Sequence, residues 1–267
     1  MFEQLLNNNI HQNQQQFNIA PFVNKAANLG NNHITITNSI NYLQENYDEL
    51  NIGRNELNAI WDDLNQPLYV KILTTFWWGS LSHKDQAPLF YNTNNLQQLL
   101  DISEAMQADL TNINNPNNNF HEGINLLYNR LKLINGEYKL RGINTAFFTK
   151  ILQFGISNQR QPIIADKWST TAILADMINQ NQEFNHIFHL KRNAANNITI
   201  KFRGSATNEF QKYYTMLEYF NNRCNQLEIN PLAMEEIMFG YGGAGAMQDI
   251  HNPRVIATHI ILDYLNQ

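Results

Sequence analysis

Two segments with helical character lie on either side of a glycine-containing turn in the middle of the chain. In residues 120–133 apolar side chains recur every three or four positions, which predicts a helix, and the apolar segment 145–155 predicts a second one. Thr145 is expected to cap the second helix and Gly155 to end it. We expect these two helices and the turn that joins them, called the hairpin below, to span about residues 120–155.

The rest of the chain also has mainly helical patterns. We therefore expect a mostly α-helical fold with little or no sheet. Alternating residues predict short strands at 33–37 and 198–202, which can pair. A break in the pattern divides the chain into an Asn/Gln-rich segment with a helix, residues 1–55, and a hairpin-containing domain, residues 56–267. Further helices are expected at residues 39–50, 67–78, 96–110, 169–178, 208–227, 231–241 and 252–265.

Composition narrows the class of protein. With 267 residues, of which 43% are hydrophobic, the chain can bury a sizeable core. Its single cysteine, Cys224, excludes an intrachain disulfide and a cysteine-ligated iron–sulfur cluster, and we expect it in the core of a protein from a reducing compartment. Neither a signal peptide nor an apolar stretch of membrane-span length is found, so we expect a cytoplasmic protein with no membrane partner. We also expect a monomer without a cofactor.

Basic residues are concentrated in two stretches of a chain whose formal net charge is −5. Residues 130–168 contain seven basic and two acidic residues, which gives a local charge of +5. Residues 191–223 contain six basic and two acidic residues, which gives +4. Such a face can meet phosphates even when the total charge is negative, although a charge cluster is often only a solvated surface.

The connection between the two hairpin helices contains a turn, residues 140–144, that suits phosphate binding. Gly142 accepts the positive φ that such a turn needs, and Asn144 is of the non-glycine type that best tolerates it. Backbone N–H groups in a turn of this kind can bind a phosphate, and Arg141 would add a positive charge.

One carboxylate, Asp166, follows the second hairpin helix in an apolar setting. The segment Pro162–Ala165 precedes it, and another helix is expected shortly after it. A partly desolvated carboxylate in this position can stabilise positive charge on a sugar and orient a water molecule. Alternatively Asp166 only caps the next helix, and the two roles are compatible.

Together, residues 140–144 and Asp166 resemble the helix-hairpin-helix DNA glycosylases, specifically the bacterial branch with the 8-oxoguanine DNA glycosylase fold. Residues 234–242 are also similar to a late helix of that branch, and some of its members act in defence against phages with modified DNA bases. The resemblance implies two helical lobes with the hairpin at the cleft between them. It also implies a hydrolase that flips a damaged or modified base out of double-stranded DNA and excises it with the help of Asp166, in base repair or antiviral defence. It assigns DNA binding to Arg141, Gly142, Ile143, Asn144 and Thr145.

The resemblance also bears on the reaction steps. Some of these glycosylases carry a hairpin lysine that forms a Schiff base and cleaves the strand, but Ala146 occupies that position here. We therefore expect a monofunctional enzyme without lyase activity. Lys150 and Lys167 remain candidates for an amine at the catalytic site, and each can instead be a phosphate contact or a surface residue. The candidates for an aromatic base pocket, which can equally be core residues, are Phe76, Trp77, Trp78, Phe239 and Tyr241.

Two other interpretations of the sequence stay open. A non-catalytic DNA-binding or interaction protein could retain the hairpin without the chemistry. Two departures from the family pattern favour it: Arg141 replaces its proline, and Asn144 replaces its second glycine. Glu183, His186 and His189 have the spacing of metal ligands on a helix. A carboxylate-bridged site would need a second such motif, which the sequence lacks, so no metal is expected.

Overall fold

The computed structural model divides the chain into two compact units, and most of each unit is helical. Unit 1 comprises Met1–Asn13 and Arg160–Gln267, and unit 2 comprises Gln14–Gln159. The mostly α-helical fold class is confirmed, with two small antiparallel sheets among the described residues. The structure describes residues 1–7, 16–29, 34–79, 93–132, 136–138, 145–157, 162–193, 197–205, 208–240 and 247–267.

Unit 2 contains the pair of helices predicted for the hairpin. They are α8 (Phe120–Lys132) and α9 (Thr145–Gly155), within a residue of the predicted bounds. The rings of Tyr128 and Phe148 meet edge to face between them, with centroids 4.8 Å apart. The other elements of this unit are β1 (Phe17–Asn18), α2 (Ala20–Leu29), α3 (Ile34–Asn46), η1 (Asp48–Leu50), β2 (Asn51–Ile52), α4 (Arg54–Asp62), α5 (Leu68–Trp78) and α7 (Thr93–Asn114).

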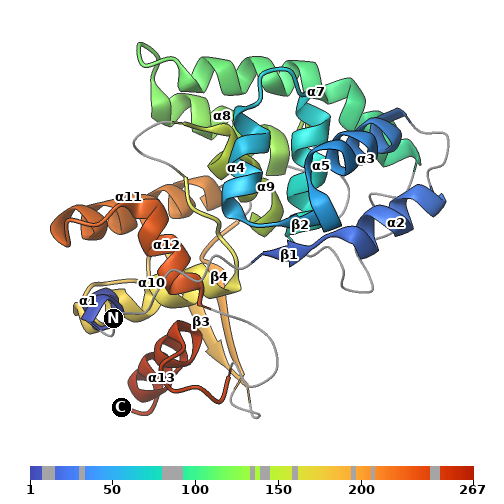
Figure 1. Ribbon diagram of the computed structural model, residues 1–267. Helices are drawn as coiled ribbons and strands as arrows, with labels where there is room; N and C mark the ends of the chain where they lie inside the picture. Colours follow the sequence, from blue (N-terminus) through green and yellow to red (C-terminus); the bar gives the residue numbers. More distant parts are fainter. Residues whose placement is uncertain are drawn as a thin grey trace. The chain divides into compact units, whose positions relative to one another are not determined.

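Unit 1 is built from helices that precede and follow a two-stranded hairpin (Figure 1). Helix α10 lies against both α12 and α13, and α11 contacts α12 and β4. Asn252 caps α13 through its side chain, as expected for an Asn-Pro start. The elements are α1 (Phe2–Asn7), α10 (Lys167–Asn179), β3 (Phe188–Arg192), β4 (Ile198–Phe202), α11 (Glu209–Gln226), α12 (Pro231–Phe239) and α13 (Pro253–Leu265).

One of the two predicted strands is wrong. Ile34–Asn46 is the helix α3, in which Ile36, Ser39 and Leu43 are buried at the three- and four-residue spacing of a helix face. The strand predicted at 198–202 is confirmed as β4, but its partner is β3 of the same hairpin.

The boundary expected after residue 55 does not coincide with the division into units. Helix α3, before that point, packs on α5 and α7, which follow it, and β2 contacts α4. Contacts therefore cross residue 55 within unit 2. The divisions between the units fall between Asn13 and Gln14 and between Gln159 and Arg160.

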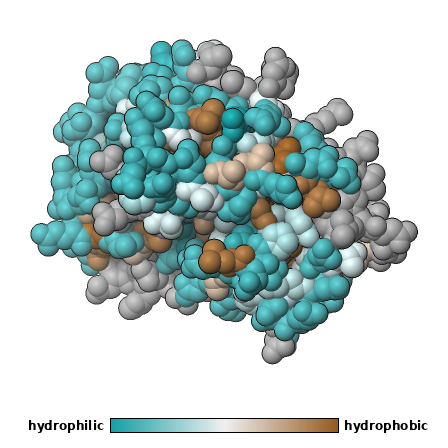
Figure 2. Space-filling view, turned by 90° about the horizontal axis from the view of Figure 1, so that it is seen from above, coloured by the Kyte–Doolittle hydropathy of each residue, from teal (hydrophilic) through white to brown (hydrophobic). Residues whose placement is uncertain are grey.

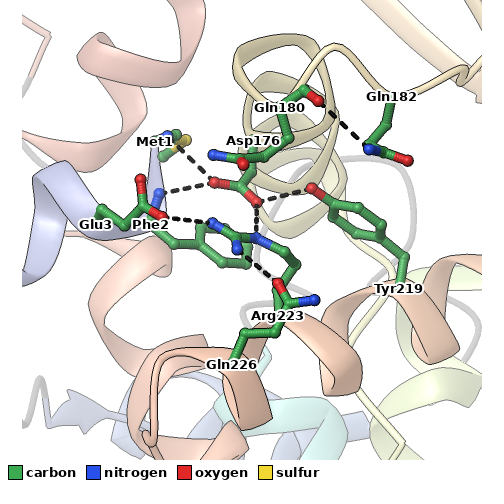
Figure 3. A network of polar contacts seen from close by, with 9 residues as sticks. All are labelled: Met1, Phe2, Glu3, Asp176, Gln180, Gln182, Tyr219, Arg223 and Gln226. Atoms are coloured by element: carbon green, nitrogen blue, oxygen red, sulfur yellow. Dashed lines mark hydrogen bonds and ion pairs between the residues drawn. The ribbon is translucent and has the colours of Figure 1, made fainter.

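Asp176 on α10 is the buried centre of a polar network that joins α1, α10 and α11 (Figure 3). Its Oδ1 accepts a hydrogen bond from Phe2 N at 2.9 Å and lies 3.1 Å from the Met1 amino group. Its Oδ2 accepts hydrogen bonds from the Tyr219 hydroxyl at 2.8 Å and from Arg223 Nε at 3.0 Å. Burial alone would raise the pKa of Asp176, but these partners outweigh it and lower the pKa below its ordinary value.

Arg223 extends this network from the interior to the surface. Its Nη2 lies 3.1 Å from Glu3 Oε1, and its Nη1 donates a hydrogen bond to Gln226 Oε1 at 2.7 Å. The Glu3 side chain is 53% exposed, whereas that of Asp176 has no exposed surface. The two ion pairs of Arg223 therefore differ in how strongly solvent screens them.

The surface drawn in Figure 2 is mainly hydrophilic, with apolar residues in small separate groups. This agrees with the many Asn and Gln residues of the sequence. Among the described helices, none is long and apolar enough to cross a membrane.

Candidate functional site

The segment that leads into α10 is held by buried hydrogen bonds from three helices of unit 1. The Tyr213 hydroxyl donates to Ile163 O at 2.9 Å, and Ile164 N donates to Glu235 Oε1 at 2.8 Å. The Ser169 hydroxyl contacts Ile164 O. Burial, assisted by the charge of Glu235, raises the pKa of Tyr213 well above its ordinary value, so the hydroxyl stays protonated and can donate.

Asp166, at the end of this segment, is the N-terminal cap of α10. Its Oδ1 accepts hydrogen bonds from Trp168 N at 2.8 Å and Ser169 N at 2.9 Å, and the Ser169 hydroxyl lies 2.8 Å from the same oxygen. The helix predicted from residue 169 therefore starts earlier than expected, because Asp166 is its cap and Lys167 is its first residue. The capping role considered for Asp166 is present.

Capping engages only one oxygen of the Asp166 carboxylate. Its Oδ2 has no hydrogen-bond partner among the residues that the structure describes, and the side chain is half-buried. The N-terminus of a helix is an electropositive end, where negative charge is stabilised. Oδ2 is thus available to a ligand, while Oδ1 fixes the orientation of the carboxylate.

Arg254, in the first turn of α13, places a guanidinium beside two aromatic rings. Its Cζ lies 4.6 Å from the ring centroid of Trp168 and 4.9 Å from that of Phe239, and its Nε donates to Phe239 O at 2.7 Å. Lys167 Nζ lies 4.5 Å from the Trp168 centroid. Burial lowers the pKa of Arg254 and the nearby charge of Asp166 counteracts this, so the guanidinium keeps its positive charge.

We call Asp166, Lys167, Trp168, Phe239 and Arg254 the Asp166 cluster. It combines a carboxylate oxygen without a described partner, two cations and aromatic surface, all within unit 1. A carboxylate can stabilise a cation or orient water, a guanidinium can bind a phosphate, and an aromatic ring can stack on a base. A carboxylate, a phosphate-binding cation and stacking surface are therefore present in one cluster.

Gly240, the residue that follows α12, has a backbone conformation that favours glycine. Its φ of 60° and ψ of −158° lie in a region that is nearly exclusive to glycine. A Cβ there would also lie 2.6 Å from Asn252 Oδ1, the capping oxygen of α13. We expect Gly240→Ala to lower the free energy of unfolding by about 1–3 kcal/mol, which denaturant titration would measure.

Gly204 provides a matched control for that substitution. It also has a positive φ, 108°, but a Cβ there would meet only Asn208 Cβ, at 3.8 Å. Gly204→Ala therefore reports backbone strain without the steric clash, and its cost should be the smaller of the two. An equal loss of unfolding free energy for Gly240→Ala and Gly204→Ala would mean that the clash with the Asn252 cap contributes nothing.

Two predicted site residues, Lys150 and Thr145, lie on α9 in unit 2. Lys150 is 7% exposed, and its Nζ donates to Ala146 O at 3.2 Å and lies 5.1 Å from the Phe147 ring centroid. Thr145 is the first residue of the helix, and its hydroxyl accepts a hydrogen bond from Lys132 Nζ at 3.0 Å. Both side chains are thus engaged within α9 and α8.

The aromatic run proposed for a base pocket is part of the interior of unit 2. Phe76, Trp77 and Trp78 on α5 are 0%, 1% and 8% exposed. Phe76 meets the Phe147 ring edge to face at 5.7 Å, and Trp78 meets the Phe154 ring at 5.5 Å. These rings pack against protein, as the core interpretation of the run expects.

Of the predicted site residues, the structure brings Asp166, Lys167 and Phe239 together. Trp168 and Arg254 complete that group, and neither was predicted from the sequence. One signal could have pointed to Arg254: a cation in the first turn of a helix opposes the helix dipole, which suggests a compensating contact. The predicted residues outside the described part of the chain are Arg141, Gly142, Ile143, Asn144 and Tyr241.

The structure supplies no support for metal or thiol chemistry. Glu183 lies in a segment without regular secondary structure, His186 lies in a turn and His189 lies on β3, so the three residues are not on a helix. Within the described ranges, no group of three or more His, Cys, Asp or Glu side chains is placed to hold a metal ion. Burial raises the pKa of the Cys224 thiol to about 12, which makes it a core residue rather than a nucleophile.

Comparison with known proteins does not assign the chain to a family. No protein-family model matches it, and no match is found among curated proteins or solved structures.

Proposed function

We propose that this protein is a DNA glycosylase that excises a damaged or modified base from double-stranded DNA. The observation that carries the proposal is Asp166, whose Oδ1 is fixed by the cap of α10 while its Oδ2 has no described partner. The resemblance of residues 140–144 and Asp166 to the helix-hairpin-helix glycosylases supports it, and so does the pair of helices α8 and α9. Such an enzyme would act in the cytoplasm as a monomer.

The proposed reaction breaks the bond between the sugar C1′ and the base nitrogen. The bonding electron pair leaves with the base, and the sugar develops positive charge, which the negative charge of Asp166 stabilises. A water molecule held by Oδ2 then adds to C1′, and its proton passes to the carboxylate and on to solvent or to the departing base. The products are the free base and an abasic site.

Arg254 is proposed to hold a phosphate next to the flipped nucleotide. Its guanidinium is half-buried, keeps its charge, and lies over Trp168 and Phe239. Charge-assisted bonds from a guanidinium to phosphate oxygens are strong and directional. The stacked rings restrict the Arg254 side chain, which reduces the entropy lost on binding.

We propose that the enzyme is monofunctional. Lys150 is buried and its amine is hydrogen-bonded within its own helix, which does not suit a Schiff-base nucleophile. Lys167 is exposed and adjoins Asp166, so it is the amine to test. Borohydride added during turnover should trap no covalent complex, whereas a complex lost in Lys167→Gln would establish lyase chemistry at that residue.

A duplex panel tests the proposed activity and identifies the substrate. Duplexes with 8-oxoguanine, uracil, an alkylated base, hydroxymethylcytosine or glucosylated hydroxymethylcytosine would be incubated with the protein, and free base would be measured. Release from one duplex is the expected result. Release of a damaged base would indicate repair, and release of a phage-type modified cytosine would indicate antiviral defence.

A non-catalytic DNA-binding protein is the second candidate. The observation that favours it is that Asp166 already has a structural role as a cap. Binding to the duplexes without release of any base would support this candidate and reject the glycosylase.

A further inference from the structure

The hairpin of β3 and β4 exposes a set of cations on one of its faces. Alternation along the strands directs Lys191, Thr199, Lys201 and Arg203 to solvent, and all four are exposed. His189 is exposed on the same face, opposite Lys201 in the register. We call these five residues the basic hairpin face.

A hollow of about 480 Å³ lies at this hairpin. Its lining includes Lys191, Lys201 and Arg203 of the basic hairpin face, together with Arg192, and it includes no acidic residue. Arg192 is also held by a hydrogen bond from its Nη1 to Asn266 Oδ1 at 2.7 Å. Four cations thus share one concave surface.

Three of these cations are not neutralised by described residues. Lys191, Lys201 and Arg203 make no ion pair with any residue in the described ranges. In the other basic stretch of the sequence, by contrast, Arg130 pairs with Asp109 at 2.5 Å and with Glu137 at 3.3 Å. The charge at the hairpin is therefore available to an external anion.

The strand geometry fixes where the cations stand. Lys201 lies on β4 and Arg203 follows one residue after its end, so the two are spaced by roughly 6.5–7 Å. Lys191 lies on β3 opposite Thr199, which places it diagonally from Lys201, at roughly 7–8 Å. Arg203 N donates to Ile187 O at 2.8 Å, so the antiparallel pairing continues beyond Phe202. The cations form a fixed array rather than a set of loop side chains.

We propose that the basic hairpin face binds the phosphate backbone of duplex DNA, as a contact separate from the residue 140–144 turn. A repeating polyanion complements an array of several cations, and a two-stranded ribbon has dimensions that fit a DNA groove. A membrane surface fits less well, because membrane-binding faces combine basic with apolar side chains and the five outward residues include none. The inference rests on the proposed function only in taking duplex DNA as the partner.

The test measures how the affinity for DNA depends on salt. The full chain is titrated with an unmodified duplex of about 20 base pairs, by fluorescence anisotropy, at several salt concentrations between 0.05 and 0.3 M (roughly the range in which phosphate contacts dominate). In the triple variant Lys191→Gln, Lys201→Gln, Arg203→Gln, loss of three phosphate contacts should lower the slope of log K against log salt by about 2.7. Binding should weaken on the order of 10²-fold at about 0.1 M salt.

Matched variants separate a direct contact from a general charge effect. The triple variant Lys191→Arg, Lys201→Arg, Arg203→Lys keeps every charge and should keep both affinity and slope. Thr199→Glu places an acid among the cations and should weaken binding. Lys212→Gln removes one cation of unit 1 outside the hollow and should leave the slope unchanged.

The outcomes distinguish this inference from the proposed function. Unchanged affinity and slope in the glutamine variant, with base release and DNA binding intact, would overturn the hairpin contact alone. Weakened binding in that variant, with no base released from any duplex by the wild type, would support the hairpin contact and reject the glycosylase. Vesicles that contain phosphatidylserine serve as a competing polyanion, and preferential binding to them through the same residues would overturn the assignment to DNA.

Discussion

Replacement of Asp166 by asparagine should reduce base release by roughly 10²–10⁴-fold, the contribution expected of one group that acts on charge and proton transfer in a transition state. Asparagine is as good a helix cap as aspartate, so its Oδ1 can keep the hydrogen bonds to Trp168 N and Ser169 N. The fold and the DNA affinity should therefore change little. Single-turnover release of free base, on the duplex that the wild type processes, measures the effect.

Two variants make this result specific to the carboxylate. Asp263→Asn removes one exposed negative charge elsewhere in unit 1 and should retain full activity. Asp166→Ala removes the cap as well as the charge and should cost about 1 kcal/mol of stability in addition to activity. Undiminished base release by Asp166→Asn would reject Asp166 as the catalytic residue and, with it, the proposed mechanism.

The largest loss of stability is expected at Asp176. Its side chain is fully buried between Phe2 N, the Met1 amino group, Tyr219 and Arg223. Asp176→Ala would leave buried positive charge without a partner, and breaking a buried ion pair in this way typically costs about 3–5 kcal/mol. Denaturant titration of the free energy of unfolding measures the loss.

Glu3→Gln is the control within the same network. It removes the other carboxylate that contacts Arg223, but the Glu3 side chain is 53% exposed. Exposed pairs contribute about 0–1 kcal/mol, so this variant should be nearly as stable as the wild type. Similar losses for Glu3→Gln and Asp176→Ala would mean that burial does not set the strength of the network.

The pH dependence of stability should carry the signature of Asp176. Because its folded pKa lies below the unfolded value, its contribution is fully present above about pH 4 and is lost as the pH falls through the folded pKa. At acidic pH the unfolded state therefore binds the proton first, and stability falls. Asp176→Asn should flatten this acid limb of the stability curve, whereas a curve parallel to that of the wild type would assign the acid sensitivity to other groups.

Local pattern was sufficient for most helices. The bounds of α8, α9, α11 and α12 follow from apolar spacing and from Pro, Asn and Gly at the ends, because capping and amphipathic burial are properties of a few consecutive residues. Local pattern failed at Ile34–Asn46. There isoleucine and threonine alternate, which favours a strand. In the structure α3 instead buries Ile36 and Leu43 along one helix face, so tertiary packing overrides strand propensity.

Local sequence pattern revealed only part of the Asp166 cluster, because some of its residues come together only in the tertiary structure. Asp166 stands out in sequence because a lone carboxylate follows an apolar segment. Its cap is made by neighbours in sequence, Trp168 and Ser169, but its charged neighbour Arg254 comes from α13, far along the chain. Apolar spacing gives no sign of such a partner.

The sequence by itself determined the helical class, the two hairpin helices, the strand β4 and the position of the carboxylate. Only the tertiary structure decided that Trp78 packs inside unit 2, that Asp176 is buried among four partners, and that Lys191, Lys201 and Arg203 share one exposed face. The physical reason is the distance along the chain over which each interaction acts. Helix periodicity and capping act over a few residues, whereas burial of charge and strand pairing depend on groups that only folding brings into contact.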